Sequence, residues 1–131
     1  MLQQDNRLRK VRDFNLILKH GRWVNGQFLD IKALELAKNQ NFFPKKEDPE
    51  SFKNQLKLAI STGLKVHKSA VKRNRVRRQI REAVRLLIKD GAIKNGYYIL
   101  VVAKKDILNK NYPEISQEIK VLLSKAKVLK V

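Results

Sequence analysis

The stretch SAVKRNRVRRQIREAVRLLIKDG, residues 69–91, sets the fold of this chain, because it is strongly basic and periodic at the same time. Residues 65–89 hold ten lysines and arginines against a single acid, Glu82. A run of like charge is usually disordered, but apolar residues recur within this one at helical spacing. These residues are Val76, Ile80, Ala83, Val84 and Leu87. The spacing predicts a helix over residues 69–89, whose apolar face must be covered by a folded body.

The opposite face of this predicted helix is polar and cationic. It carries Asn74, Arg75, Arg77, Arg78, Arg81 and Arg85. A charged helix face is often simply solvated, but here arginine dominates and acidic partners at i±4 are nearly absent. The planar guanidinium group matches phosphate oxygens and base edges better than the point charge of lysine does. We therefore predict nucleic-acid binding, with RNA as the favoured partner. Arg73 lies nearer the apolar border, so it could bind RNA or anchor the helix to a carbonyl or an acid.

The composition is that of a folded, basic protein. A length of 131 residues fits one domain, residues 1–131, and 43% hydrophobic residues is too many for a disordered basic tail. The net charge of +18 creates self-repulsion, which a phosphate-rich partner would relieve. No segment approaches the roughly 20 apolar residues of a membrane span, so we expect no membrane partner. The N-terminus lacks the apolar core of a signal peptide, and there are no cysteines. A cytoplasmic location follows.

The remaining pattern predicts a single-domain α+β sandwich in the order α-β-β-α-β-α. Helices are predicted at residues 12–20, at residues 69–89 and from Tyr112-Pro113-Glu114 onward, and strands at residues 27–36, 56–62 and 97–104. Residues 1–10 form a basic arm, and residues 37–54 form a long hairpin loop. The apolar run YYILVVAK, residues 97–104, is typical of a strand covered on both faces. We expect Phe42 and Phe43, within the long loop, to pack on the sheet rather than to bind a ligand.

The chain shows no catalytic constellation. His20 and His67 are far apart in sequence and have no cluster of carboxylates beside them. The acids Asp13, Asp30 and Glu35 and those at residues 47–50 lack the spacing of metal ligands. No glycine-rich phosphate loop is present. We predict that the polypeptide holds no catalytic residue and no metal site of its own.

An ordered set of motifs resembles the bacterial ribonuclease P protein family. The Arg73-Asn74-Arg75 motif lies in the basic helix after Ala70-Val71. Upstream stand NRLRKVRDF at residues 6–14, LKHG at residues 18–21 and QF at residues 27–28, and downstream stands YYILVVAKK at residues 97–105. One short basic motif would be weak evidence, but these motifs span most of the chain in the family's order.

The resemblance implies a fold and a function. The fold would contain a left-handed β-α-β crossover, as in the ribosomal protein S5 domain 2-like fold, against the usual right-handed rule. The protein would be a subunit of ribonuclease P, the endoribonuclease that removes the 5′ leader of precursor tRNA. Its partners would be the catalytic RNA and the leader, with no protein oligomer required. The RNA subunit would perform the hydrolysis and would hold most of the magnesium ions.

The resemblance also implies roles for individual residues. The surface for the catalytic RNA would comprise Lys68, Lys72, Arg73, Asn74, Arg75, Arg77, Arg78, Arg81 and Arg85. The leader-binding cleft would comprise Phe14, Phe28, Lys65, Lys104 and Lys105. Both phenylalanines could equally be core residues, and the lysines could be ordinary surface residues.

The chain departs from the family pattern at two positions of this cleft. Leu18 and Ile31 stand where many members have aromatic residues. The cleft should therefore rely less on stacking and more on charge. Trp23 could compensate for the missing rings, or it could have a surface or capping role.

A second hypothesis from the residues is a ribosomal-type structural RNA-binding protein without association with a nuclease. Small, basic, cysteine-free chains are common in that class. Such a protein would show no preference for precursor tRNA over mature tRNA. Binding to DNA is less favoured, because no helix-turn-helix spacing precedes the basic helix.

Overall fold

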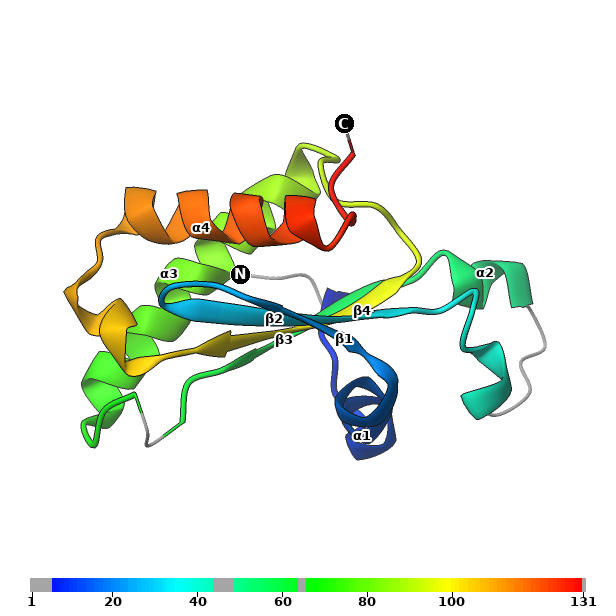
Figure 1. Cartoon of the computed structure of the whole chain (residues 1–131), viewed down its shortest axis with the longest axis horizontal. Helices are drawn as coiled ribbons and strands as arrows, with labels where there is room; N and C mark the ends of the chain where they lie inside the picture. The colour runs from blue at the N-terminus through cyan, green and yellow to red at the C-terminus, as the bar shows by residue number, and fades with distance from the viewer. Residues whose placement is uncertain (1–5, 44–48, 64–65, 131) are drawn as a thin grey trace.

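The computed structural model describes residues 6–43, 49–63 and 66–130, and it forms one sheet with helices on both faces (Figure 1). The elements in chain order are α1 (Val11–His20), β1 (Arg22–Asn25), β2 (Leu29–Glu35), η2 (Gln40–Phe42), α2 (Pro49–Lys53), β3 (Leu56–Ser61), α3 (Ala70–Lys89), β4 (Tyr97–Ala103), η3 (Lys105–Asn109) and α4 (Tyr112–Lys125). The predicted α+β class is confirmed.

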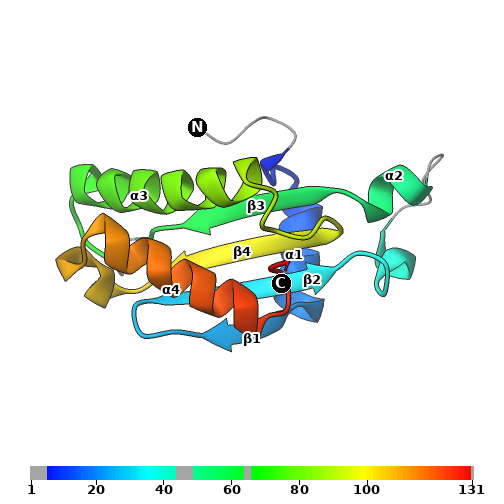
Figure 2. The same cartoon turned by 90° about the horizontal axis from the view of Figure 1, so that it is seen from above.

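The strands lie in the order β1-β2-β4-β3. Strand β2 pairs antiparallel with β1 and with β4, whereas β3 and β4 are parallel. Helices α3 and α4 cover one face of the sheet, and α1 lies across the other (Figures 1 and 2). Helix α3 connects the two parallel strands, so β3-α3-β4 is a β-α-β unit. The left-handed sense of this crossover stays a prediction.

The predicted element order is wrong at β1. This strand has four residues, three of them exposed, so it shows no alternation of apolar and polar side chains that could signal a strand. It exists because it pairs with β2 from Arg22↔Ala33 to Asn25↔Asp30. Trp23, which lies outside every helix and strand predicted from the sequence, is therefore a strand residue.

Residues 37–54 do not form the predicted hairpin loop. Strands β2 and β3 are not neighbours, because β4 lies between them. The connection instead contains η2 and α2, and residues 44–48 lie outside the described part. Phe43 is buried, as predicted, and meets Phe52 and Tyr98 edge to face. Phe42 contradicts the prediction, because it is 43% exposed and stacks on His20.

The basic helix α3 begins one residue after its predicted start and ends at the predicted residue, Lys89. Ser69 caps it by accepting a hydrogen bond from the backbone N–H of Lys72 at 3.5 Å. The apolar stripe is buried in full, and it comprises Val76, Ile80, Ala83, Val84 and Leu87. The helix periodicity therefore determines which side faces the sheet and which side stays open.

Strand β4 is covered on both faces, as its apolar run predicts. Ile99 and Val101 join the core beneath α3 and α4, whereas Tyr98 and Leu100 join the core beneath α1. Helix α4 begins at a capping box formed by Asn111 and Glu114. It buries Ile115, Ile119, Leu122 and Leu123. Within the described residues, no helix is long and apolar enough to cross a membrane.

Tyr98 couples the core beneath α1 to pH. Its hydroxyl donates a hydrogen bond to Oε1 of Gln55 at 2.8 Å, and burial raises the pKa of Tyr98 to about 12. In the unfolded chain the same phenol ionises near pH 10. The neutral phenol therefore stabilises the fold fully below about pH 10, and this contribution is lost as the pH rises from about 10 to about 12.

We predict that the Tyr98→Phe variant loses less stability than the wild type over this alkaline range. The difference should be about 1–3 kcal/mol in the free energy of unfolding, measured by urea denaturation at a series of pH values. Lysine deprotonation affects both proteins alike, so the comparison isolates Tyr98. Identical pH slopes would show that the phenol is not buried as described.

Candidate nucleic-acid interface

The open face of α3 carries most of the RNA-binding residues predicted from the sequence. Arg75 and Arg78 are exposed, and Arg77 and Arg81 are half-buried. Arg77 donates a hydrogen bond to Oδ1 of Asn74 at 3.0 Å, which orders the centre of this face. No acidic side chain of the described residues pairs with these four arginines. They leave a row of guanidinium groups whose charge is not neutralised by any acid in the described part of the chain.

Arg85 differs from the other arginines because it is paired internally. Its guanidinium donates two hydrogen bonds to the Glu82 carboxylate, at 2.9 and 2.5 Å. These bonds hold the pKa of Glu82 below its usual value, and the same contact raises the pKa of Arg85. The structure thus offers less free charge at the C-terminal half of α3 than the sequence suggests.

Arg73 does not anchor the helix in the way that was considered from the sequence. Its Nε atom is buried and has no hydrogen-bond partner, and its side chain bonds no acid or carbonyl among the described residues. Buried polar groups are nearly always paired in folded proteins. Arg73 as a whole is half-buried, and its contact with RNA stays a prediction.

The N-terminus of α3 is electrostatically favourable for an anion. Lys68 and Lys72 are exposed beside the first turn, where helix N–H groups and the helix dipole favour negative charge. His67 holds the approach to the helix, because its Nδ1 accepts a hydrogen bond from the Ser69 N–H at 2.8 Å. Lys65, predicted to bind the leader, lies outside the described residues.

Phe14 and the arginines of α3 meet in one pocket of about 360 Å³ at the edge strand β3. The pocket is lined by Arg7, Leu8, Arg9, Phe14, Leu58, Ala59, Ile60, Arg77 and Arg81. The N-terminal segment forms its outer wall, because the Leu8 N–H donates to the Leu58 carbonyl at 2.9 Å. Four arginines and no acid are among these lining residues. Two surfaces that were predicted to be separate are therefore continuous here.

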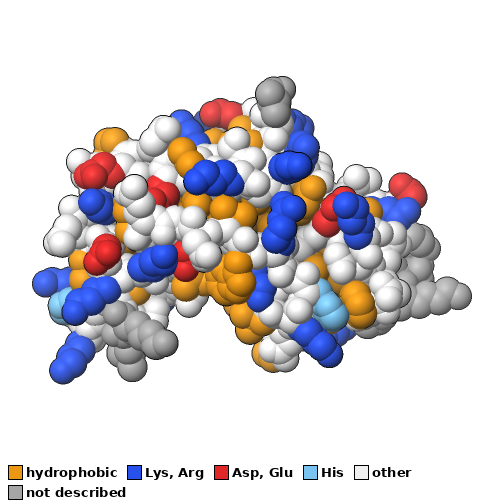
Figure 3. Space-filling model, viewed as in Figure 1, with side chains coloured by type: hydrophobic (Ala, Val, Ile, Leu, Met, Phe, Trp, Pro, Cys, Tyr) orange, Lys and Arg blue, Asp and Glu red, His pale blue; other side chains and the backbone are white. Residues whose placement is uncertain are grey.

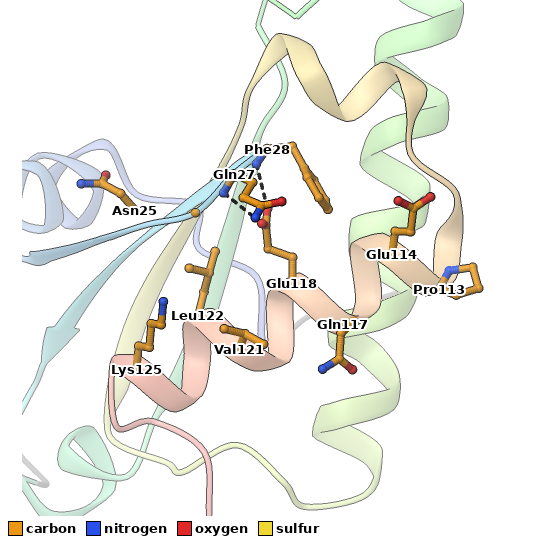
Figure 4. Close-up of a pocket in the computed structure, with 11 residues that line it drawn as sticks. Asn25, Gln27, Phe28, Pro113, Glu114, Gln117, Glu118, Val121, Leu122 and Lys125 are labelled. Carbon is orange, nitrogen blue, oxygen red and sulfur yellow. Dashed lines mark hydrogen bonds between the residues drawn. The ribbon is translucent and has the colours of Figure 1, made fainter.

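Phe28 lies on the other side of the sheet from Phe14, so the predicted cleft shared by these two rings is wrong. Phe14 packs against the core beneath α1, whereas Phe28 is 5% exposed in the core beneath α3 and α4. Its backbone N–H donates to Glu118 at 2.9 Å, and its side chain lines a groove of about 600 Å³ between the β1–β2 turn and α4 (Figure 4). Phe28 precedes β2, and the turn before this strand determines the face on which its ring lies. Alternation along a strand therefore could not predict this face.

The basic pair at the end of β4 divides into two roles. The Lys104 ammonium is 3.0 Å from Oδ1 of Asp30 and donates to the Gly26 carbonyl at 2.7 Å, so it braces the β1–β2 turn. Lys105 is exposed and remains open to a ligand. Beneath the sheet, beside α1, the molecular surface is hollowed and has hydrophobic side chains along its edge (Figure 3).

Sequence reasoning missed Arg7 and Arg9 as individual site residues. The basic character of residues 1–10 was evident, but the pocket depends on a parallel bridge between Arg7 and Leu58. It also missed the burial of Lys32. This side chain is 7% exposed, although the alternating pattern of the strand predicts an exposed polar residue at this position. Burial of Lys32 follows from the position of α1, which no local pattern encodes.

The family model described as Ribonuclease P matches residues 2–127. The chain belongs to the ribonuclease P protein family. The ribonuclease P protein component of Synechococcus sp. (strain JA-2-3B'a(2-13)) is 37% identical over 129 residues, covering 98% of this chain and 87% of the relative. That of Clostridium kluyveri is 31% identical over 124 residues, covering 95% of this chain and 96% of the relative.

Solved structures of the ribonuclease P protein family share the fold. The protein from Staphylococcus aureus superimposes with a TM-score of 0.72 at 25% identity, covering 100% of this chain and 98% of that one. The protein from Thermotoga maritima gives a TM-score of 0.69 at 23% identity, covering 91% and 96%. The resemblance drawn from the motifs is confirmed. The chain is the protein component of an endoribonuclease, and the ribosomal-type alternative is not favoured.

The Glu82–Arg85 ion pair should limit the affinity of α3 for RNA, because it neutralises one arginine. Glu82→Gln should release Arg85 and increase affinity for ribonuclease P RNA. The slope of log affinity against log salt should steepen by about 0.7–0.9, the effect of one added phosphate contact. The measurement is a binding titration over a range of salt concentrations.

The matched control is Glu50→Gln, which changes the net charge equally but breaks the Glu50–Lys53 pair on α2, away from α3. Equal effects of the two substitutions would show that only net charge matters.

Proposed function

We propose that this chain binds the catalytic RNA of ribonuclease P through the open face of α3 and binds the single-stranded 5′ leader of precursor tRNA beside α1. The RNA subunit then removes the leader from a substrate that the protein helps to hold. The observation that carries the proposal is the pocket in which Phe14, Arg77 and Arg81 meet. A base can stack on the exposed part of Phe14 while the guanidinium groups neutralise its phosphates.

The continuity of the two surfaces gives the protein a positioning role. RNA docked on α3 and a strand entering along α1 would approach each other at the edge strand β3. Stacking on Phe14 tolerates any base, which suits a leader whose sequence differs between tRNAs. Counterions released from both RNAs would supply a large part of the affinity, because the chain carries a net charge of +18.

The chemistry of bond cleavage is assigned to the RNA subunit. The described residues offer no group of three or more His, Cys, Asp or Glu side chains that could hold a metal ion. In this proposal the magnesium ions are held mainly by the RNA subunit. A cytoplasmic location and action without a protein oligomer complete the proposal.

Reconstitution tests this function directly. The chain is added to a bacterial ribonuclease P RNA with precursor tRNA at low magnesium, and the rate of leader removal is compared with that of RNA alone. We expect a faster rate and a lower magnesium requirement. A rate no better than that of RNA alone would contradict the proposal.

The shared pocket predicts how substitutions divide between assembly and substrate binding. Arg78→Ala should weaken assembly with the RNA and flatten its salt dependence by about 0.7–0.9 or less, because Arg78 does not line the pocket. Phe14→Ala should lower affinity for precursor tRNA relative to mature tRNA while assembly persists. The loss should be roughly 5- to 100-fold, the range for one stacked base.

Arg81→Ala should impair both properties, because Arg81 lies on α3 and also lines the pocket with Phe14. Assembly is measured by titration of labelled RNA, and discrimination by competition between precursor and mature tRNA. If Arg78→Ala and Phe14→Ala affected both measurements equally, the division of the interface would be wrong.

A further inference from the structure

Trp23 is an exposed aromatic side chain on the α1 side of the sheet. It is the only tryptophan of the chain, and 45% of its surface is exposed. It stands directly opposite Lys32 in the β1–β2 register, and directly opposed residues of an antiparallel pair share one face. Lys32 in turn donates a hydrogen bond to the Leu18 carbonyl of α1. The indole therefore borders the C-terminal end of α1.

The Lys32 side chain lies over the Trp23 ring and restrains it. Its ammonium lies 4.9 Å from the centre of the Trp23 ring. Lys32 is 7% exposed, and no carboxylate of the described residues forms an ion pair with it. Its charge is instead stabilised by the negative end of the α1 dipole, through the Leu18 carbonyl, and by the π face of the indole. Because Lys32 is anchored to α1 and lies against the ring, it restrains the indole, so stacking of a ligand would cost little side-chain entropy.

The position of Trp23 extends the surface that begins at Phe14. Phe14 and Leu18 are one helical turn apart on the same side of α1, separated by a rise of about 6 Å. Leu18 is exposed but offers no ring for stacking. Beyond it, at the end of the same helix, Trp23 supplies the ring from a strand. A single strand that follows α1 would thus meet an aromatic side chain at each end.

We propose that Trp23 is a stacking platform for an unpaired base of single-stranded RNA, held in place by Lys32. The assignment rests on the proposed function, because it places a second base-binding position on the leader path that starts at Phe14. The charge favours RNA as the partner. A lysine lies against the ring and the whole chain is strongly basic, so both attract the phosphates of a nucleic acid. Trp23 would then set the leader length at which affinity stops increasing.

The fluorescence of Trp23 reports on this site without a label, because the chain has no other tryptophan. The full chain is titrated with single-stranded oligoribonucleotides of increasing length. We expect the indole emission to be quenched only above the length that spans from Phe14 to Trp23. Unchanged emission, when the anisotropy of a labelled oligonucleotide shows binding, would overturn the proposal.

Variants separate stacking from a merely structural role. Trp23→Ala should weaken binding of long oligonucleotides roughly 5- to 100-fold and leave binding of the shortest ones unchanged. Trp23→Phe keeps a ring and should retain most of the affinity. The matched control is Phe42→Ala, which removes a similarly exposed ring that stacks on His20, and it should have no effect. Thermal melting of each variant checks the fold. An equal loss for short and long oligonucleotides would overturn the proposal.

Two further outcomes are decisive. Emission that changes with protein concentration but not with RNA would make Trp23 a contact between protein molecules and would overturn the platform. Quenching by RNA in a chain that fails to stimulate leader removal would refute the proposed function and still support the platform.

Discussion

Packing of the apolar face of α3 against α4 and strand β3 is the constraint on which the rest of the structure depends. Val76, Ile80 and Val84 are fully buried there, and burial of side chains of this kind contributes about 1.5–3 kcal/mol each. The repulsion among the arginines of α3 opposes folding, so the buried stripe must outweigh it. Because the stripe lies against the sheet, Arg75 and Arg78 project outward. The same contact therefore stabilises the domain and turns the basic face of α3 outward.

The two faces of the sheet divide the work of the protein. The core beneath α3 and α4 contains the apolar stripes of both helices and the Phe28 ring. The core beneath α1 leaves Phe14 partly open at one end of the helix and Trp23 exposed at the other. The N-terminal segment joins these faces at the edge strand β3, where Arg77 and Arg81 reach the Phe14 pocket. In the proposed function, this junction would bring the catalytic RNA and the leader within reach of each other.

Internal pairing tunes how much of the large positive charge remains available. Glu82 neutralises Arg85, and Asp30 holds Lys104 at the β1–β2 turn. Lys32 is stabilised without a carboxylate, by a helix C-terminus and an indole. The basic residues of this family member are therefore not interchangeable. Some build the fold, and others, such as Arg75 and Arg78, stay free for phosphate.

The sequence by itself determined the elements whose signal is local. The buried stripe of α3, the two covered faces of β4, the start of α4 and the anionic class of the partner all follow from spacing and charge within single segments. The order of the motifs along the chain also identified the protein family. Only the tertiary structure decided that β1 is a strand, that β4 separates β2 from β3, and that Phe14 meets Arg77 while Phe28 does not meet Phe14. The physical reason is that each of these depends on pairing or packing between distant segments. Helical and strand periods record which face of a segment is apolar, but they carry no information on which segment covers it.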